Sequence, residues 1–522
     1  MTIGDDVDTF IGHRRGWSVI SGHASSIFDE RNEQWLDAEA HPGPAPLSAV
    51  PDAVVQSEDF QHRIDFHRPE MLQGPPYPYQ MVAAVLGLYL DIYHHKLYPL
   101  WPIVDATSLR ARLEVPIPDV EAYMLASSVC AATILQLQLA VIGTNSSKLE
   151  PKSMISEIED LRRIHEYREQ PSLDALSTSF FLHIAYLHLG RRTISTLLLR
   201  EAISLAHMLD LHQLGHYAGL SCWEAQDHLR KLWLLFITER AHATQYDLPC
   251  IVTISPTLPA LDDTLQPFTL AAFVLLCEMF RRFQEVSSDK RHTAQSLMSL
   301  HNQLQQVPIL TRYCNDLQRA DLSITQQWMR LMFWKLAVTQ VSMTAGPSDG
   351  IQSMLFPVQI AGDLLSSMSV FSIDTLEAHG PGMELKLFEF VNTLANVMVC
   401  VPHQENRKFE LGPHNMLVHL ARILGNFRGG NNALLPILQS RMADVGLSVP
   451  AAPRFIDVTH GSADSGRTRS STESDETLGT HIDGMNTLTP SHLWAPEQSD
   501  DHYAATDTGY FDTLLPIARD SA

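Results

Sequence analysis

The segment from His228 to Pro249 limits the fold of this chain more than any other stretch. Its large apolar side chains recur at helical spacing, and they cover a face too broad for a helix that lies on the surface. The residues of this face are Leu232, Trp233, Leu235, Phe236 and Ile237. We therefore predict a long helix at the centre of an all-α protein.

Three charged residues lie within this apolar helix. Arg230, Glu239 and Arg240 need partners wherever they are buried, because an unpaired buried charge costs several kcal/mol. We expect them to pair with one another or with neighbouring groups and to organise the core. The helix should end before Pro249, because its ring removes a hydrogen-bond donor and disfavours helical angles at the preceding residue.

Helical periodicity continues over most of the chain, whereas β-strand signals are sparse. The predicted helices span about 78–97, 119–142, 151–168, 173–190, 192–212, 223–246, 268–286, 290–306, 322–344, 355–370, 384–400, 413–426 and 431–445. The helices on either side of Gly190 should form a tight antiparallel pair. Such pairs stack, so we expect an all-α body of irregular helical pairs.

Composition divides the chain into three parts. Residues 1–75 are rich in proline and show little periodicity, and residues 449–522 are rich in Ser, Thr and acids. Both compositions are typical of disordered segments. Residues 76–448 should form one large helical domain, and a hydrophobic content of 45% is enough for a sizeable core.

Charge and cysteine usage restrict the function. A formal net charge of −22 repels nucleic acid and leaves no basic stripe for DNA. The six cysteines are widely spaced, with no CxxC, so we interpret them as buried thiols in a reducing compartment. We see no secretion signal, and the longest apolar run, 81–90, is about half the length that crosses a bilayer. We expect no membrane association.

One segment of the acidic tail alternates acids with aromatic and leucine side chains. Its apolar residues are Tyr510, Phe511, Leu514 and Leu515. This pattern is typical of an activation segment that folds on a coactivator groove. A solvated tail with chance apolar residues is an equally weighted alternative.

The sequence offers little for metal binding or catalysis. His212 and His216 have the spacing of two zinc ligands on one helix, but Gly215 between them favours a helix end. The Asp262-Asp263 pair lacks the third acid that a magnesium-dependent terpene cyclase needs. There is no glycine-rich phosphate loop and no nucleophile elbow. We therefore expect no enzyme, and no cofactor or metal site in this chain.

Two other groups of residues are interpreted as packing residues. His183 and His188 are five residues apart and do not share a helical face well, so we interpret them as core or groove histidines. An aromatic and methionine stripe surrounds Trp328. Such a stripe is typical of core, and the wall of a small-molecule site is the alternative interpretation.

Several motifs occur in an order that is similar to that of a known family. They are the proline-aromatic turn with Tyr98 and Pro99, the helix that leads into Leu211-His212, the central helix with Arg230, Trp233, Glu239, Arg240 and Pro249, and the segment before Trp328. Together they resemble the middle homology region of fungal binuclear zinc-cluster (Zn2Cys6) transcription regulators. Residues 319–328 and 429–436 look most like those of amylase and maltose-utilisation activators. Lys231 replaces a usual arginine, and the zinc cluster itself is missing.

The resemblance implies both a function and partners. It implies a transcription regulator of a fungal metabolic gene set, either for carbohydrate utilisation or for a secondary-metabolite cluster. The implied location is the nucleus, together with the cytoplasm. Implied partners are transcriptional coactivators or a related regulator, with a dimer as a possibility. Zinc and direct DNA contact would need an N-terminal six-cysteine cluster that these residues lack. A helical scaffold, an inhibitory partner of a full-length regulator and a remote enzyme are the alternatives.

Overall fold

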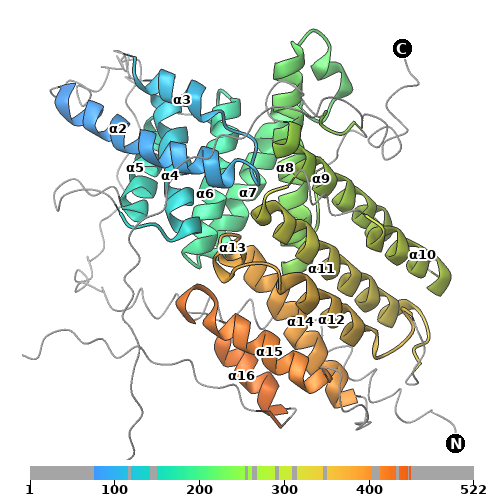
Figure 1. Ribbon diagram of the computed structural model, residues 1–522. Coiled ribbons are helices and arrows are strands. Elements are labelled where there is room, and N and C mark those ends of the chain that lie inside the picture. The colour runs from blue at the N-terminus through green and yellow to red at the C-terminus, as the bar shows by residue number, and fades with distance from the viewer. Residues whose placement is uncertain are drawn as a thin grey trace, which may run out of the picture. The chain divides into compact units, whose positions relative to one another are not determined.

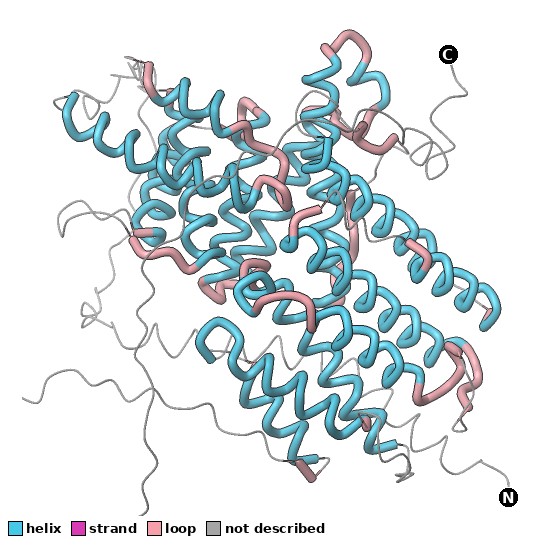
Figure 2. Tube along the Cα trace, viewed as in Figure 1, coloured by secondary structure: helices cyan, strands magenta, loops and turns pink. Residues whose placement is uncertain are grey.

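The described part of the chain is helical. The computed structural model describes residues 76–447, except 116–118, 142–149, 166, 253–256, 261–266, 289–292, 308–313, 345–349, 401–411, 431–433 and 445. Within these residues the β-structure is limited to an isolated bridge between Thr344 and Ser353 (Figure 2). The all-α prediction is confirmed. The predicted N-terminal segment, the acidic tail and its candidate activation residues lie outside the described residues.

The helices follow one another along the chain (Figure 1). They are α2 (Pro76–Ile92), η3 (Tyr93–Leu97), α3 (Ala106–Leu113), α4 (Val120–Leu137), α5 (Pro151–Ile164), α6 (Leu173–His188), α7 (Arg192–Met208), η4 (Leu214–Tyr217), α8 (Cys222–Tyr246), α9 (Pro267–Ser288), α10 (Ala294–Gln305), α11 (Asp316–Gln340), α12 (Phe356–Met368), α13 (Ile373–Glu377), α14 (Pro381–Cys400), α15 (Pro413–Asn426), η5 (Phe427–Gly430) and α16 (Leu435–Asp444). Four of them, α3, α13, η4 and η5, are absent from the predicted set, because eight residues or fewer are too few to show a helical period.

Some helix ends differ from the predicted ones for local reasons. Helix α7 ends at Met208 rather than near residue 212, and Asp210 then adopts a left-handed conformation with φ of 56°. Helix α11 begins at Asp316, several residues early, because Asn315 and Gln318 form a reciprocal capping box. The first predicted helix ends in the single π-turn η3.

The N-terminal helices are built around α4 and α6. Helix α4 packs against α2, α5 and α6, and α6 packs in turn against α7. The predicted antiparallel pair is present, and Gly190 closes α6 with a positive φ of 71°. By length and composition α4 is the one described helix that could cross a membrane, but 72% of that stretch is buried inside the protein. A buried core helix satisfies the same criterion.

The C-terminal helices are built around α11 and α14. Helix α11 packs against α9, α10, α12 and α14, and α14 packs against α12, α15 and α16 (Figure 1). Helix α8 packs against α7 on one side and α9 on the other, so it joins the two groups of helices. Its ends are those predicted: Ser221 and Glu224 form a capping box, and Asp247 ends it with φ of 53°.

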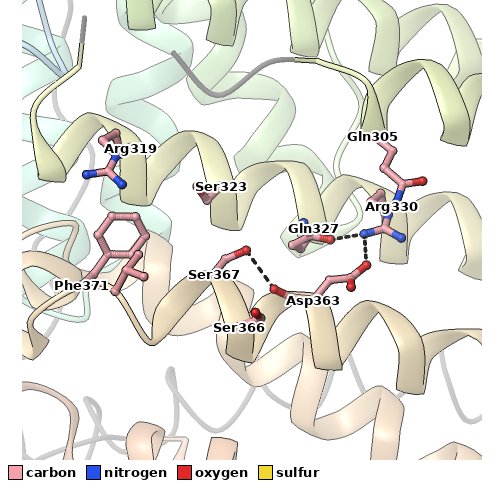
Figure 3. Close-up of a pocket in the computed structure, with 10 residues that line it drawn as sticks. Gln305, Arg319, Ser323, Gln327, Arg330, Asp363, Ser366, Ser367 and Phe371 are labelled. Atoms are coloured by element: carbon pink, nitrogen blue, oxygen red, sulfur yellow. Dashed lines mark hydrogen bonds and ion pairs between the residues drawn. The ribbon is translucent and has the colours of Figure 1, made fainter. Parts of the chain in front are cut away.

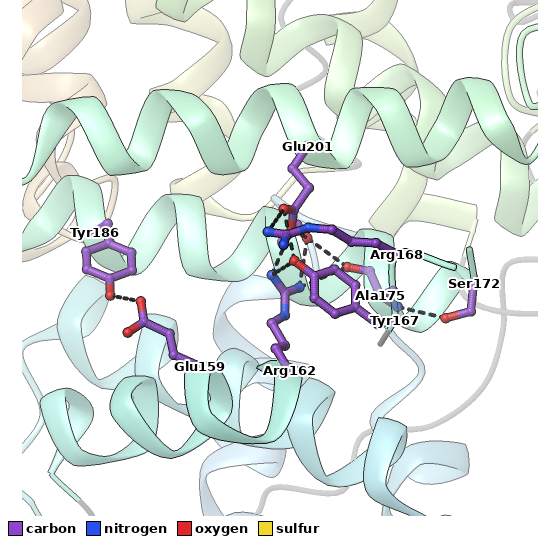
Figure 4. Close-up of polar contacts among 9 residues, drawn as sticks. Glu159, Arg162, Tyr167, Arg168, Ser172, Ala175, Tyr186 and Glu201 are labelled. Carbon is purple, nitrogen blue, oxygen red and sulfur yellow. Dashed lines mark hydrogen bonds and ion pairs between the residues drawn. The ribbon is translucent and has the colours of Figure 1, made fainter. Parts of the chain in front are cut away.

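A carboxylate on α7 ties α5, α6 and α7 together (Figure 4). Glu201 pairs with Arg162 of α5 at 2.9 Å and with Arg168 at 3.1 Å. It also accepts hydrogen bonds from the hydroxyl groups of Tyr167 at 2.9 Å and Ser179 at 2.8 Å. We call these residues the Glu201 cluster.

Arg428 joins η5 to the end of α4. Arg428 has a left-handed backbone with φ of 51°. Its side chain donates from Nη2 to the carbonyl of Leu135 at 2.8 Å and from Nη1 to that of Gln136 at 2.9 Å. These carbonyls belong to the last turn of α4, where helix geometry leaves them without intrahelical donors. Its backbone N–H donates to Glu377 at 2.7 Å.

Candidate functional site

The buried charges of α8 clamp the loop that follows the helix. Only 1% of the Glu239 side chain is exposed. Its carboxylate pairs with Arg240 at 2.5 Å and with Arg200 of α7. It also accepts hydrogen bonds from the backbone N–H groups of Ile251 and Val252 at 2.8 and 2.9 Å. We call this set the Glu239 clamp.

The two arginines of the clamp bind the same loop from the other direction. Arg240 Nη2 donates to the carbonyl of Val252 at 2.8 Å, and Arg200 donates to the carbonyl of Pro249. Arg240 Nε donates to Gln284 of α9 at 2.7 Å. The clamp therefore connects α7, α8, α9 and the loop after Pro249, which is a structural role.

The proline-aromatic turn after η3 is fixed by side chains from three separate segments. Three carbonyls of the turn accept hydrogen bonds: that of Pro102 from Arg230 Nε at 2.9 Å, that of Pro99 from Gln318 Nε2 at 3.3 Å, and that of Trp101 from the Tyr93 hydroxyl at 2.6 Å. Arg230 also lies 3.5 Å from Asp227. The motif residues of the turn and of α8 thus contact each other directly.

A cavity of about 170 Å³ lies against this turn. Its walls come from α6, α8, α9, α11 and α14, with Leu100 and Trp101 of the turn and Gln136 of α4. Leucine, isoleucine and aromatic side chains supply most of the apolar lining. The turn, α8 and α11, which line part of the cavity, also carry family-like motifs.

One wall of the cavity holds an ion pair. Asp321 Oδ1 lies 3.3 Å from Lys386 Nζ and accepts a hydrogen bond from the Thr325 hydroxyl at 3.0 Å. Lys386 also donates to Thr325 at 2.6 Å. Burial works to raise the pKa of Asp321, but the Lys386 charge and these hydrogen bonds outweigh it and hold the pKa below its usual value. The two charges cancel.

Histidines form much of the remaining polar lining. Burial lowers the pKa of His183 to about 4 and that of His242 to about 3, and it also lowers the pKa of His379. His188, on the same helix as His183, has its pKa lowered to about 3 by burial and then by the charge of Arg428. All four are neutral at pH 7. His183 and His188 both line this cavity although they are five residues apart, because the wall follows α6 along its length.

A second pocket, of about 410 Å³, lies beside α10, α11 and α12 (Figure 3). Its charges are already paired: Arg330 contacts Asp363 at 2.6 Å, and Arg319 contacts Asp316 at 2.8 Å while lying 5.5 Å from the centre of the Phe371 ring. It is more polar and more open to solvent than the first. We therefore take the histidine-lined cavity as the candidate functional site.

The remaining predicted residues are placed as follows. Trp233 and Trp328 are buried in the core, and Trp328 packs 5.8 Å from Phe283. Trp328 lines neither of these two pockets, which favours the core interpretation of its stripe. Tyr98 is partly buried and packs edge-on against Tyr93.

The buried-thiol interpretation of the cysteines needs correction, whereas the expected helix end near His212 and His216 is present. These two histidines do not share a helix, because α7 ends at Met208 and His216 lies in η4, 2.8 Å from His228. Among the described residues no group of three or more potential metal ligands occurs. Of the six cysteines only Cys130 and Cys277 are buried, while Cys222 and Cys250 are exposed near the two ends of α8.

Sequence reasoning missed the polar residues of the cavity. Asp321, Lys386, His242 and His379 come from separate helices and have no common spacing. A weak signal existed for Asp321 and Lys386, because each is a charge inside an apolar helical pattern. The same argument, that a charge inside an apolar helix needs a partner, singles out Glu239.

Comparisons with known proteins identify fungal relatives of low identity. A probable sucrose utilization protein of Candida albicans is 25% identical over 321 residues, which is 58% of this chain and 63% of the relative. A maltose fermentation regulatory protein of Saccharomyces cerevisiae is 24% identical over 396 residues, or 73% of this chain and 83% of the relative. A respiratory transcription factor of the same yeast is 23% identical, over 67% of this chain and 77% of the relative.

These relatives test the resemblance seen in the sequence. This chain spans just under two thirds of the sucrose relative. No family model matches the chain, and no solved structure is significantly similar to it. The expected similarity to fungal zinc-cluster regulators of sugar utilisation is confirmed, at low identity over most of the chain.

Proposed function

We propose that this chain regulates transcription of carbohydrate-utilisation genes in a fungus, through a helical regulatory domain at residues 76–448. The observation that carries the proposal is the alignment with a maltose fermentation regulator over 73% of this chain. The relatives are regulators and not enzymes, which supports a role in interaction rather than catalysis. A secondary-metabolite gene set is the second candidate within this class.

Promoter contact would be indirect in this proposal. The six cysteines lie between residues 130 and 400, and the net charge is −22, so these residues supply neither a compact zinc cluster nor a basic stripe. DNA binding would come from a partner regulator or from a segment beyond these residues, where zinc would also be bound. The site of action is the nucleus.

Transcript profiling of a deletion strain tests the proposal. Loss of the gene should lower transcripts for sugar uptake and hydrolysis when maltose or sucrose is the carbon source, and should leave them unchanged on glucose. Re-expression of the chain should restore them. Unchanged sugar transcripts with altered secondary-metabolite transcripts would select the second candidate, and no transcript change at all would favour a helical scaffold.

The tail has its own test. Residues 449–522, fused to a heterologous DNA-binding domain, should activate a reporter through Tyr510, Phe511, Leu514 and Leu515 docked on a coactivator. Replacing these four residues by alanine should abolish activation. A matched control replaces four tail serines by alanine and should keep it. Activity that survives the first change would assign activation to acidity alone.

A further inference from the structure

In the second pocket, beside α10, α11 and α12, the ion pair of Arg319 occupies only one edge of its guanidinium group. Asp316 accepts from Nη1 of Arg319 at 2.8 Å. Arg319 Nε is buried and has no hydrogen-bond partner, and no hydrogen bond joins Nη2 to a described residue. Nε and Nη2 together form the fork that binds a carboxylate or a phosphate through two parallel hydrogen bonds. This fork of Arg319 is unoccupied.

Further donors follow Arg319 along α11. The residues that share its helical face and line the pocket come at intervals of four, four and three positions, and they are Ser323, Gln327 and Arg330. Gln327 uses its side-chain oxygen to accept from Arg330, so its amide N–H groups remain available. Arg330 is 4% exposed, and it pairs through Nη1 and Nε while Nη2 donates to no described residue. This face of α11 therefore has N–H donors to spare.

The charged side chains that line the second pocket leave one positive charge in excess. They are the guanidinium groups of Arg319 and Arg330 and the carboxylate of Asp363. Asp316 does not line the pocket and is 65% exposed, so water screens its charge. An occupant with one anionic group matches both this excess charge and the unused donors, whereas a cation would be repelled.

The shape of the pocket suits an elongated polar molecule. Figure 3 shows Arg319 and Phe371 at one end and Gln305, Arg330 and Asp363 at the other, with serine side chains between them. The two arginines are eleven residues apart on α11, which is about 16 Å along the helix axis. A volume of about 410 Å³ is typical of small-molecule sites. We propose that this pocket binds a small polar organic acid, whose carboxylate or phosphate ester accepts from Nε and Nη2 of Arg319 while its body lies along α11 toward Arg330.

Calorimetric titration of the purified full chain tests the proposal. The probes are pantothenate for a carboxylate and adenosine 5′-monophosphate for a phosphate ester, with panthenol and adenosine as their uncharged controls. At least one acid should bind saturably and more tightly than its control, and the acid that does so identifies the kind of oxyanion. Failure of both acids to bind, or binding no tighter than that of the controls, would leave water as the partner of Arg319 Nε and overturn the proposal.

Two variants locate the site. Arg319→Lys keeps the positive charge but replaces the fork by a single ammonium group, so it should weaken binding of the acid on the order of tenfold or more. Ser366→Leu fills the pocket from an exposed position on α12, where the core is not disturbed, and should weaken binding as well. Arg163→Lys is the matched control. Arg163 also pairs with an acid three residues earlier, Asp160, but it lies outside the pocket, so binding should not change.

The outcomes keep this site separate from the proposed function. Binding that is unchanged in both Arg319→Lys and Ser366→Leu, or that falls equally in Arg319→Lys and Arg163→Lys, overturns the assignment to this pocket. A chain that controls sugar transcripts but binds neither acid overturns only the site. A chain that binds an acid through Arg319 but alters no transcript supports the site and overturns only the regulatory role.

Discussion

Glu201 and Glu239 stand on neighbouring helices, and each carboxylate receives two arginines, yet their surroundings differ. Glu201 is 20% exposed and is bound by side chains alone, from α5, α6 and the connection between them. Glu239 is 1% exposed and is bound by two arginines and two backbone N–H groups of a loop. One carboxylate joins side chains on helices, whereas the other holds a segment of backbone in place.

The two carboxylates show two ways in which a protein accommodates a buried charge. Side-chain partners can move toward water when one of them is lost, and Glu201 keeps contact with solvent through Arg168, which is 74% exposed. Backbone N–H groups of a packed loop have no such freedom, so loss of the carboxylate leaves them unpaired. The Glu239 clamp should therefore contribute more to stability than the Glu201 cluster.

The largest effect is expected for Glu239→Ala. It removes the partner of Arg200, Arg240 and two backbone N–H groups, and should lower the free energy of unfolding by about 3–5 kcal/mol. Glu201→Ala should cost less, about 1–3 kcal/mol, because Glu201 is itself 20% exposed and one of its two arginine partners, Arg168, reaches solvent. Urea denaturation of the two purified variants measures both.

Equal destabilisation by the two substitutions would contradict the larger contribution of the Glu239 clamp. Glu239→Gln is the control for packing, since it keeps the shape of the side chain and removes its charge. It should fall between wild type and Glu239→Ala. A melting temperature unchanged by Glu239→Ala would show that the clamp has no part in stability.

Acid should separate the cavity histidines from the Glu201 cluster, because the two lose their stabilising contributions in different pH ranges. His183 and His242 titrate near pH 6.5 when unfolded but have pKa values of about 4 and 3 when folded, because burial disfavours the charged form. Below pH 6.5 the unfolded state binds more protons, so stability falls with pH by about 1.4 kcal/mol per pH unit for each histidine. Each loss should reach about 2 kcal/mol by pH 5.

The Glu201 contribution should be lost later in the same titration. Burial works to raise the pKa of Glu201, but Arg162 and the hydrogen bonds of the cluster lower it below its ordinary value. Its stabilisation is thus present above about pH 4.5 and disappears as pH falls through the lower folded pKa. Denaturation curves at pH 7, 6, 5 and 4 measure both. His242→Gln should reduce the slope above pH 5, and His94→Gln, at an exposed position, should not.

The smallest effect is expected for Arg168→Ala. This residue is the exposed member of the Glu201 cluster, and exposed ion pairs contribute only about 0–1 kcal/mol. Arg162, which is 7% exposed and also donates to Ser179 and the carbonyl of Ala175, is the matched buried position. Arg162→Ala should destabilise more. If Arg168→Ala cost as much, the cluster would be as enclosed as the clamp.

The sequence predicted most of the fold, because long amphipathic helices show their period directly. The end of α8 before Pro249 and the pair joined at Gly190 follow from backbone chemistry that is local to a few residues. Helices of eight residues or fewer, such as α3, have no such period to detect. The end of α7 depends on a left-handed Asp210, a conformation that the sequence pattern does not reveal.

The site was predictable only in part. Glu239 and Arg240 were recognisable as charges in an apolar helix, and they are adjacent in sequence. The cavity could not be predicted in this way, because Asp321 and Lys386 lie 65 residues apart and meet only through the packing of α11 on α14. The hydrogen bonds of His183 and His379 depend on the carbonyls of Ser195 and Leu317, whose positions only the fold fixes.

The bonds from Arg428 to the end of α4 have a consequence for the synthesis of the chain. Arg428 and Gln136 are 292 residues apart. Ribosomes add on the order of 5–20 residues per second, so α4 should wait roughly 15–60 s for this cap to emerge. Apolar helix surfaces exposed during such an interval are prone to aggregation. The nascent protein is therefore expected to depend on chaperones until its last helices are made.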